Sequence, residues 1–229
     1  MKFDYNFLKT LIDLLKVNGY AFCFFGEDYC GRSVILRHDV DFSVTKAYEH
    51  ALFEQAKGVN STYFFLLRTD FYNPLSAENL ALIRKIGGMG HRVGLHFDSG
   101  DLATNLRVFS EGIGMAVTDF SFHRPAPKLV GKVFEMPGFN NAYSPRYIKE
   151  FKYLSDSRRA WRENPFNVVE TLPEKLCILT HPIWYATSEI GFKETLTALC
   201  GTAAKECFAH LKSNIRELEK DLNITDIKF

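Results

Sequence analysis

The alternation of helix-type and strand-type patterns in the first half of the chain restricts its fold more than any other feature. Segments with apolar residues at helical spacing alternate with short runs of β-branched and aromatic residues. In chain order these segments cover residues 33–36, 45–55, 61–67, 76–86, 93–97, 102–113 and 116–122. Strands separated by helices pair in parallel through right-handed crossovers. The pattern therefore predicts an α/β fold with a mostly parallel sheet.

The whole chain, residues 1–229, is predicted to form a single domain. Its 229 residues, 46% of them apolar, suit one ordinary core, and no internal repeat or low-complexity linker divides them. Residues 1–32 are predicted to form an N-terminal extension that consists of one helix and a hairpin. A last strand is predicted at 176–180. The apolar register Leu211, Ile215, Leu218 and Leu222 then predicts a C-terminal helix within 190–229.

Charge and cysteine usage exclude several classes of partner. Lys plus Arg number 28 and Asp plus Glu number 27, so no bulk charge attracts nucleic acid or an acidic membrane. The longest apolar runs are far shorter than the roughly 20 residues of a membrane span, and the N-terminus has no signal-peptide pattern. The five cysteines are scattered without a C-x-x-C pair, so we expect mostly buried, reduced thiols. A cytoplasmic protein is predicted.

Histidines and aspartates follow four of the predicted strands. In parallel α/β folds, the carboxyl ends of strands carry the functional site. Because residues i and i+2 share a face of a strand, Asp39 lies beside Asp41, and His96 beside Asp98. Paired carboxylates repel each other unless a cation lies between them. A divalent metal site is therefore predicted at this edge of the sheet. The segments are 37–41, 94–98, 121–125 and 179–182.

For several polar residues a structural role competes with a functional one. Asp41 could cap the following helix rather than bind a metal. His50 and His210 lie in charged helical surroundings and are predicted to be surface residues. His91 follows a glycine cluster and is expected to make a structural hydrogen bond. His38 lies on the strand face opposite the two aspartates, where a packing role is expected.

Five short motifs occur along the chain in the same order as in the polysaccharide deacetylase family. The resemblance is to the homology domain of the chitooligosaccharide deacetylase type. The resemblance spans residues 34–185 and is greatest to a short branch without a leader, found among enzymes of surface-polysaccharide biosynthesis. It implies a deformed (β/α) barrel holding a metal, usually zinc, that removes an acetyl group from an acetylated sugar. The motifs are Asp39-Val40-Asp41, Gly90-His91-Arg92-Val93-Gly94-Leu95-His96, Arg124-Pro125, Asp156 with Trp161, and Leu179-Thr180-His181-Pro182.

The resemblance implies that Asp41 and His96 bind the metal. The family's second histidine ligand follows the first by four residues, and here that position is Gly100. A three-ligand zinc site therefore needs a substitute. We predict that His123, at the next strand end, takes this place, with Asp98 as the alternative.

The resemblance also implies the residues that handle protons. Asp39 would be the general base and His181 the general acid. Arg124 would orient Asp39, and Asp156 would support His181 or Arg124. The family usually has adjacent aspartates, whereas Val40 separates them here, so the choice of base and ligand between Asp39 and Asp41 stays open.

The predicted function is metal-dependent removal of an acetyl group from an N-acetylated sugar precursor, small or carrier-linked, in O-antigen or capsule-type biosynthesis. The predicted cofactor is a divalent metal, with Zn²⁺ preferred. Trp161, Trp184 and Tyr185 are candidates for flat surfaces against a sugar ring, and Trp184 is equally suited to a core position. A catalytically inactive carbohydrate-binding barrel would explain Gly100. Another metal-dependent hydrolase, such as a phosphoesterase, would explain the aspartates and histidines but not the order of the motifs.

Overall fold

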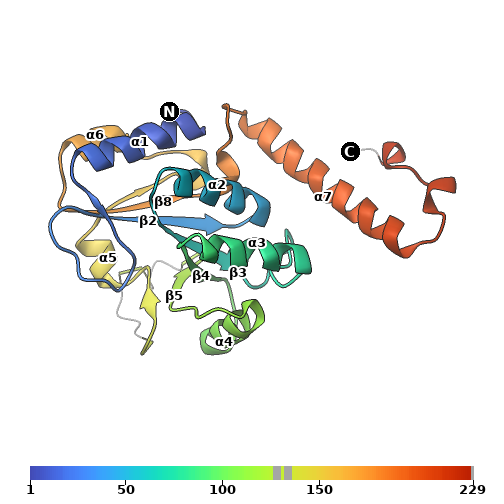
Figure 1. Ribbon diagram of the computed structural model, residues 1–229, viewed down its shortest axis with the longest axis horizontal. Helices are drawn as coiled ribbons and strands as arrows, with labels where there is room; N and C mark the ends of the chain where they lie inside the picture. Colours follow the sequence, from blue (N-terminus) through green and yellow to red (C-terminus); the bar gives the residue numbers. More distant parts are fainter. Residues whose placement is uncertain (126–129, 132–135, 228–229) are drawn as a thin grey trace. The chain divides into compact units, whose positions relative to one another are not determined.

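The computed structural model describes residues 1–125, 130–131 and 136–227 (Figure 1). The chain divides into two compact units, residues 1–189 and residues 190–229, and each is described by itself. The smaller unit consists of helix α7 (Phe192–Asn214) and two short 3-10 helices, η3 (Leu218–Lys220) and η4 (Ile224–Asp226). The single-domain prediction stays a prediction, because compactness alone does not say which parts fold independently.

The larger unit is built on an eight-stranded sheet whose paired strands all run parallel. The strand order is β6-β5-β4-β3-β2-β8-β7, and the short β1 also pairs with β2. This confirms the predicted α/β class and parallel sheet. The strands are β1 (Ala21–Phe22), β2 (Ser33–Val40), β3 (Thr62–Leu66), β4 (Arg92–Phe97), β5 (Asp119–Phe122), β6 (Asn140–Asn141), β7 (Lys152–Ser155) and β8 (Lys175–Thr180).

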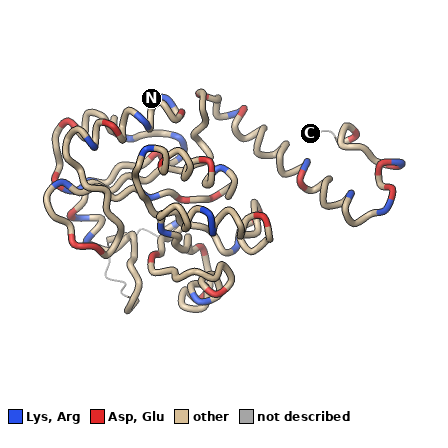
Figure 2. The backbone as a smooth tube through the Cα atoms, viewed as in Figure 1, with Lys and Arg blue, Asp and Glu red and all other residues tan. Residues whose placement is uncertain are grey.

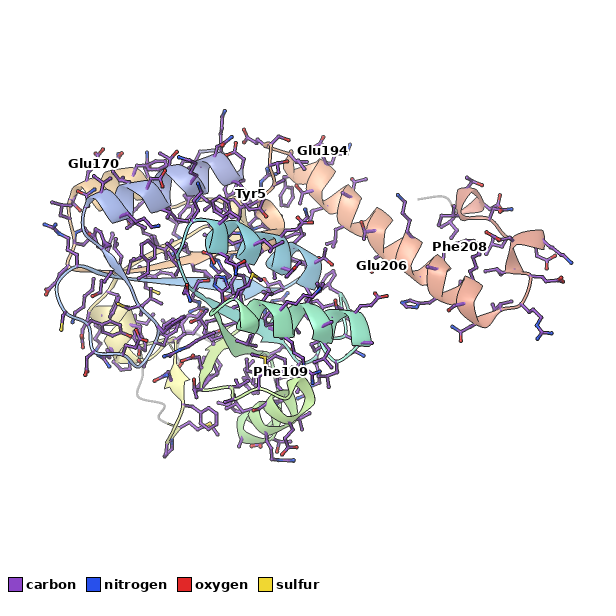
Figure 3. All side chains as sticks on the ribbon, in the orientation of Figure 1. Tyr5, Phe109, Glu170, Glu194, Glu206 and Phe208 are labelled. Carbon is purple, nitrogen blue, oxygen red and sulfur yellow. The ribbon has the colours of Figure 1, made fainter. Side chains whose placement is uncertain are left out.

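Helices connect the strands and cover the sheet (Figure 1). The first helix forms where predicted: Asp4 caps it by accepting a hydrogen bond from the Phe7 amide at 2.8 Å, and its apolar stripe is buried. Phe109, labelled in Figure 3, is fully buried in the large core cluster. The helices of this unit are α1 (Tyr5–Val17), α2 (Val44–Ala56), α3 (Ala77–Gly88), α4 (Leu102–Ile113), α5 (Pro145–Lys149) and α6 (Pro165–Glu170), with 3-10 helices η1 (Ser157–Arg159) and η2 (Pro182–Trp184).

The sheet is curled into a half-barrel, the deformed barrel that the motifs imply. A second core cluster fills its inner face around Ile35 of β2. Ala142 enters this cluster from the β6 edge, while Phe151 and Tyr153 enter it from the β7 edge. Residues from opposite edges can share one cluster only because the sheet bends toward itself.

Two local predictions are wrong. The sequence predicted a hairpin of β1 and β2, but these strands pair in parallel, with Ala21 opposite Ser33. The chain between them returns to the starting end of β1 before β2 begins. The C-terminal helix lies earlier than its predicted register and ends at Asn214. Ile215 has an extended backbone with φ of −108° and ψ of 115°, which ends the helix before the rest of the predicted register.

The structure also shows how the charged residues, the apolar helices and the cysteines are distributed. Blue and red segments are mixed along the chain in Figure 2. No helix within the described ranges is both long and apolar enough to span a bilayer. All five cysteines are free, but only Cys177 is buried, while Cys30, Cys200 and Cys207 are exposed. The expectation of mostly buried thiols is therefore wrong, because these three lie on a loop and on the exposed face of α7.

Candidate metal centre and active site

Strand β2 carries polar side chains on both of its faces. Arg37 and Asp39 meet on the inner face, and Asp41 follows directly after the strand on the same side. His38 points to the outer face, where its Nε2 lies 2.9 Å from Oε1 of Glu54 on α2. The alternation expected of a strand therefore places His38 and the two aspartates on opposite sides of the sheet.

Asp41 is not the cap of the following helix. The N-cap of α2 is Ser43, whose hydroxyl accepts a hydrogen bond from the Lys46 amide at 3.2 Å. The capping alternative for Asp41 is therefore wrong, and its carboxylate is left for another role.

Three side chains from three strand ends converge on the inner face. Oδ1 of Asp41 lies 3.3 Å from Nε2 of His96 and 3.3 Å from Nδ1 of His123. The two imidazole rings are edge to face, with centroids 5.0 Å apart. One ligand atom from each residue lies within 4.8 Å of the others, so a single ion can reach all three. These residues come from β2, β4 and β5, the strand ends that the sequence predicted to meet.

The hydrogen bonds around this group suit a cation. Nδ1 of His96 lies 2.7 Å from the Ser121 hydroxyl, which leaves Nε2 directed at the carboxylate. Oδ1 of Asp41 and Nδ1 of His123 are buried, and although they lie 3.3 Å apart, within the described part of the chain neither makes a hydrogen bond of acceptable geometry. Buried polar atoms without partners are costly. A carboxylate and two imidazoles in this arrangement therefore fit a divalent metal of the zinc type.

Asp39 is held by an arginine that the sequence analysis did not single out. Arg37 donates from Nε to Oδ1 at 3.1 Å and from Nη2 to Oδ2 at 2.9 Å, and both side chains are almost fully buried. Burial alone would raise the pKa of Asp39, but the charge and hydrogen bonds of the Arg37 guanidinium lower it below its usual value. The spacing i, i+2 on β2 was the signal for this pair. Arg124 is exposed, and its role toward Asp39 stays a prediction.

His181 and Asp156 form a second polar pair beside the metal group. Nδ1 of His181 lies 2.6 Å from Oδ1 of Asp156, whose Oδ2 accepts from the His181 amide at 3.1 Å and from the Tyr185 hydroxyl at 2.9 Å. Burial lowers the pKa of His181, but Asp156 outweighs burial and raises it to about 9. Nε2 of His181 is 3.9 Å from Oδ2 of Asp41, so a largely protonated imidazole faces the metal group.

The loop after β4 explains the missing histidine. Gly100 has φ of +91°, a conformation that residues with a side chain rarely adopt, and a Cβ atom there would lie 2.6 Å from Nη2 of Arg68. Asp98, the alternative third ligand, is exposed and lies outside the group formed by Asp41, His96 and His123. The geometry therefore favours His123 over Asp98 as the third ligand.

A cleft with a volume of about 540 Å³ opens beside His123. Arg68, Asp98 and Arg124 contribute charge to its lining, and Phe71 contributes an aromatic ring that is 55% exposed. A cleft of this size accommodates a sugar-sized ligand next to the metal group.

The aromatic residues that the sequence offered as sugar platforms are all buried. Trp161 packs against Phe7 with ring centroids 6.0 Å apart, and Trp184 against Phe42 at 6.3 Å. Tyr185 supports Asp156 instead of facing a cleft. The platforms predicted at Trp161 and Tyr185 are therefore wrong, and Trp184 takes the core position that its alternative interpretation gave it.

The remaining histidines divide into core and surface. His50 is only 1% exposed, and burial lowers its pKa to about 3, so its predicted surface position is wrong. Its helix turns it toward β2, where its ring lies tilted against that of His38 with centroids 4.5 Å apart. His91 accepts a hydrogen bond from the Ser61 amide at 3.2 Å, which confirms its structural role, and His210 is exposed as predicted.

Comparison of the sequence with models of protein families finds no match, and neither does comparison with curated proteins. Solved structures with a similar path include a peptidoglycan deacetylase from Bdellovibrio bacteriovorus, at 16% identity over 88% of this chain and 55% of that one, with a TM-score of 0.44. A CE4 family pseudoenzyme from Bacillus anthracis matches at 15% identity over 80% of this chain and 65% of that one, with a TM-score of 0.41.

A family 4 acetyl xylan esterase from Clostridium thermocellum, in complex with a cobalt ion, matches at 15% identity over 76% of this chain and 84% of that one, with a TM-score of 0.38. The chain thus spans 65% to 67% of the length of the two structures of the Bacillus anthracis pseudoenzyme and its mutant with restored activity. Because all these TM-scores are below 0.5, function has to be inferred from the residues of this chain.

Proposed function

We propose that this protein is a metal-dependent deacetylase that removes the acetyl group from an N-acetylated sugar precursor of a surface polysaccharide of the O-antigen or capsule type. The observation that carries the proposal is the convergence of Asp41, His96 and His123, with two unpartnered buried atoms, beside the His181–Asp156 pair. Metal ligands next to a separate acid and a separate carboxylate are the parts that amide hydrolysis needs.

The metal supported by this ligand set is Zn²⁺. When bound, such an ion polarises the acetyl carbonyl and lowers the pKa of a bound water to about 7. The two histidines supply neutral imidazoles, and Asp41 supplies one negative charge. Ser121 keeps His96 in the orientation that presents Nε2 to the ion.

The chain's own residues would handle the protons. Asp39 takes a proton from the attacking water, and the lowered pKa keeps its carboxylate charged at neutral pH. His181 donates a proton to the departing amine, because its pKa near 9 keeps the imidazole protonated at neutral pH. Asp156 fixes the ring of His181 through Nδ1, which leaves Nε2 free to reach the leaving group. Arg124, at the edge of the cleft, is proposed to help orient the substrate and Asp39.

The substrate is proposed to be a soluble or carrier-linked N-acetyl sugar that the protein meets in the cytoplasm. Free thiols at five of five cysteine positions suit a reducing compartment. The near-zero net charge and the mixed charges in Figure 2 offer no basis for binding nucleic acid. Recovery of the native protein mainly from an extracytoplasmic fraction would contradict this part of the proposal.

The test is release of acetate from a panel of nucleotide-linked and free N-acetyl sugars by the zinc-loaded protein. His123→Ala and Asp98→Ala form a matched pair, since both residues line the same cleft and only His123 belongs to the metal group. We expect His123→Ala to abolish acetate release and Asp98→Ala to retain it. Release of phosphate without acetate would support a phosphoesterase instead.

A carbohydrate-binding protein without turnover is the second candidate, and Gly100 favours it. The glycine takes the place of the family's second histidine ligand and suits the turn in its own right. Calorimetry separates the two candidates: binding of a sugar by zinc-loaded protein, without acetate release over many hours, would establish the binder.

A further inference from the structure

A second group of metal-ligating side chains lies on the outer face of β2, away from the cleft. It consists of His38 on the strand and of His50 and Glu54 on α2, each at most 2% exposed. His50 and Glu54 are one helical turn apart, so they lie on the same face of α2. One ligand atom from each residue lies within 4.8 Å of the other two.

Groups outside the cluster hold the other polar atoms of two of these side chains. Nδ1 of His38 lies 2.7 Å from the Thr180 hydroxyl. Oε2 of Glu54 accepts from the Ser61 hydroxyl at 2.6 Å and from the Tyr63 hydroxyl at 2.8 Å. Nε2 of His38 and Oε1 of Glu54 are thereby turned toward each other, at 2.9 Å. Metal sites orient their ligands in this way, through partners on the far side of each ligand.

His50 supplies a polar atom without a partner. Its Nδ1 is buried and makes no hydrogen bond to any described residue, and the hydroxyl of Tyr5, whose ring centroid is 5.9 Å away, is in the same condition. Tyr5 is labelled in Figure 3, at the start of α1. A cavity of about 20 Å³ borders His38, His50, Glu54 and Thr180 and is otherwise lined by apolar side chains; its volume is enough for one water.

We propose that His38, His50 and Glu54 form a second metal site, which binds a divalent cation of the zinc class through two imidazole nitrogens and one carboxylate oxygen. Water in the adjacent cavity completes a four-coordinate shell. Because the site is buried between α2 and β2, the ion fastens the helix to the strand and takes no part in turnover. The inference does not depend on the proposed deacetylase activity.

Two of the three ligands, His38 and Glu54, need to move only slightly to accept the ion. Zinc bonds of about 2.0–2.1 Å in a tetrahedral shell place ligand atoms about 3.3 Å apart. The distance of 2.9 Å between His38 and Glu54 would therefore open by a few tenths of an ångström. The hydroxyl of Thr180 can accept as well as donate, so Nδ1 of His38 can carry the ring proton when Nε2 binds the metal.

The test measures zinc content in variants that separate the two groups. Asp41→Ala combined with His123→Ala removes the inner group, and we expect this double variant to keep about one zinc per chain after dialysis against zinc and then against buffer. Addition of His50→Ala should bring the zinc content to near zero. His210→Ala in place of His50→Ala is the control, because His210 is an exposed histidine, and it should leave the one zinc in place. Cobalt in place of zinc should give tetrahedral visible absorption that depends on His50.

Two results would overturn the second site: a folded double variant that holds no zinc, or a triple variant that retains it. If His50→Ala does not fold, His50→Gln keeps a neutral polar side chain and should show the same loss of zinc. Wild-type protein that holds one zinc, and keeps it in the double variant, would support the outer site while contradicting the inner one. Each of the two metal sites, inner and outer, can therefore be contradicted without contradicting the other.

Discussion

Two groups of histidines and carboxylates lie on opposite faces of β2, and they differ in access rather than in composition. In the inner group, the side chains of Asp41 and His123 are each 15% exposed and lie beside the cleft. In the outer group, His38, His50 and Glu54 are at most 2% exposed and lie between α2 and β2. The same residue types are therefore placed for reaction on one face and for structure on the other.

The difference follows from where each group lies on the sheet. The inner group gathers at the carboxyl ends of parallel strands, where loops leave room for a ligand. The outer group lies within the layer between strand and helix, where partners such as Thr180 and Ser61 fill most hydrogen-bonding positions. The predictions below either break this division or sharpen it.

Loss of an inner ligand should have the largest effect. Asp41→Ala or His96→Ala should remove the inner metal and reduce acetate release by at least about 10³-fold, the scale of losing a principal catalytic group. The fold should persist, because the group lies at the rim of the sheet. Zinc analysis, turnover and circular dichroism on the same samples measure this. Retention of wild-type zinc content by both variants would exclude these residues as ligands.

Arg37→Met should have the largest effect on stability. Removal of the guanidinium leaves the Asp39 carboxylate buried without its partner, which costs about 3–5 kcal/mol. Denaturant unfolding measures the loss. Arg124→Met is the control, because Arg124 is exposed and its replacement should stay within about 0.5 kcal/mol. Equal stability losses in the two variants would contradict the assignment of Arg37 as the partner of Asp39.

Asp156→Asn should shift the pH dependence of turnover. The pKa of His181 is raised to about 9, so the protonated form is favoured by folding. Its contribution to stability is fully present below the ordinary pKa of about 6.5 and is lost as pH rises through 9. The alkaline limb of kcat/KM should therefore lie near pH 9 in wild type and at lower pH in the variant, with a loss of roughly tenfold at pH 8. An unshifted alkaline limb would exclude His181 as the acid.

Phe71→Ala should have the smallest effect of the four. The ring lies in the cleft and is 55% exposed, so it can stack against a sugar without belonging to the metal group. We expect KM to rise about 2- to 10-fold with kcat unchanged. Leu52→Ala, an exposed apolar change on α2, is the control. A fall in kcat at constant KM would contradict a binding role for Phe71.

Much of the inner group could be predicted because it depends on local rules. Alternation along a strand placed Asp39 and Asp41 on one face, and parallel strand ends brought His96 and His123 to the same edge. Arg37 obeyed the same i, i+2 rule, but the family motif directed the search for an arginine partner of Asp39 to Arg124 instead.

The outer group could not be predicted, because it depends on a tertiary contact. His50 stands among charged residues on α2, a local context typical of a solvated helix face. Its burial follows from the docking of α2 against β2, which brings His38 within 4.5 Å between ring centroids. The parallel pairing of β1 with β2 was hidden for a related reason, since a turn between two short strands has the same composition for either direction of the second strand.

The crystal structure of the zinc-loaded protein tests the central claim most directly, which is that Asp41, His96 and His123 together hold the metal of the active site. The account predicts Nδ1 of His123 at about 2.0–2.1 Å from the ion, together with Nε2 of His96 and a carboxylate oxygen of Asp41. An ion bound at this edge of the sheet with the His123 ring beyond about 3 Å, and Asp98 or water in its place, would contradict it.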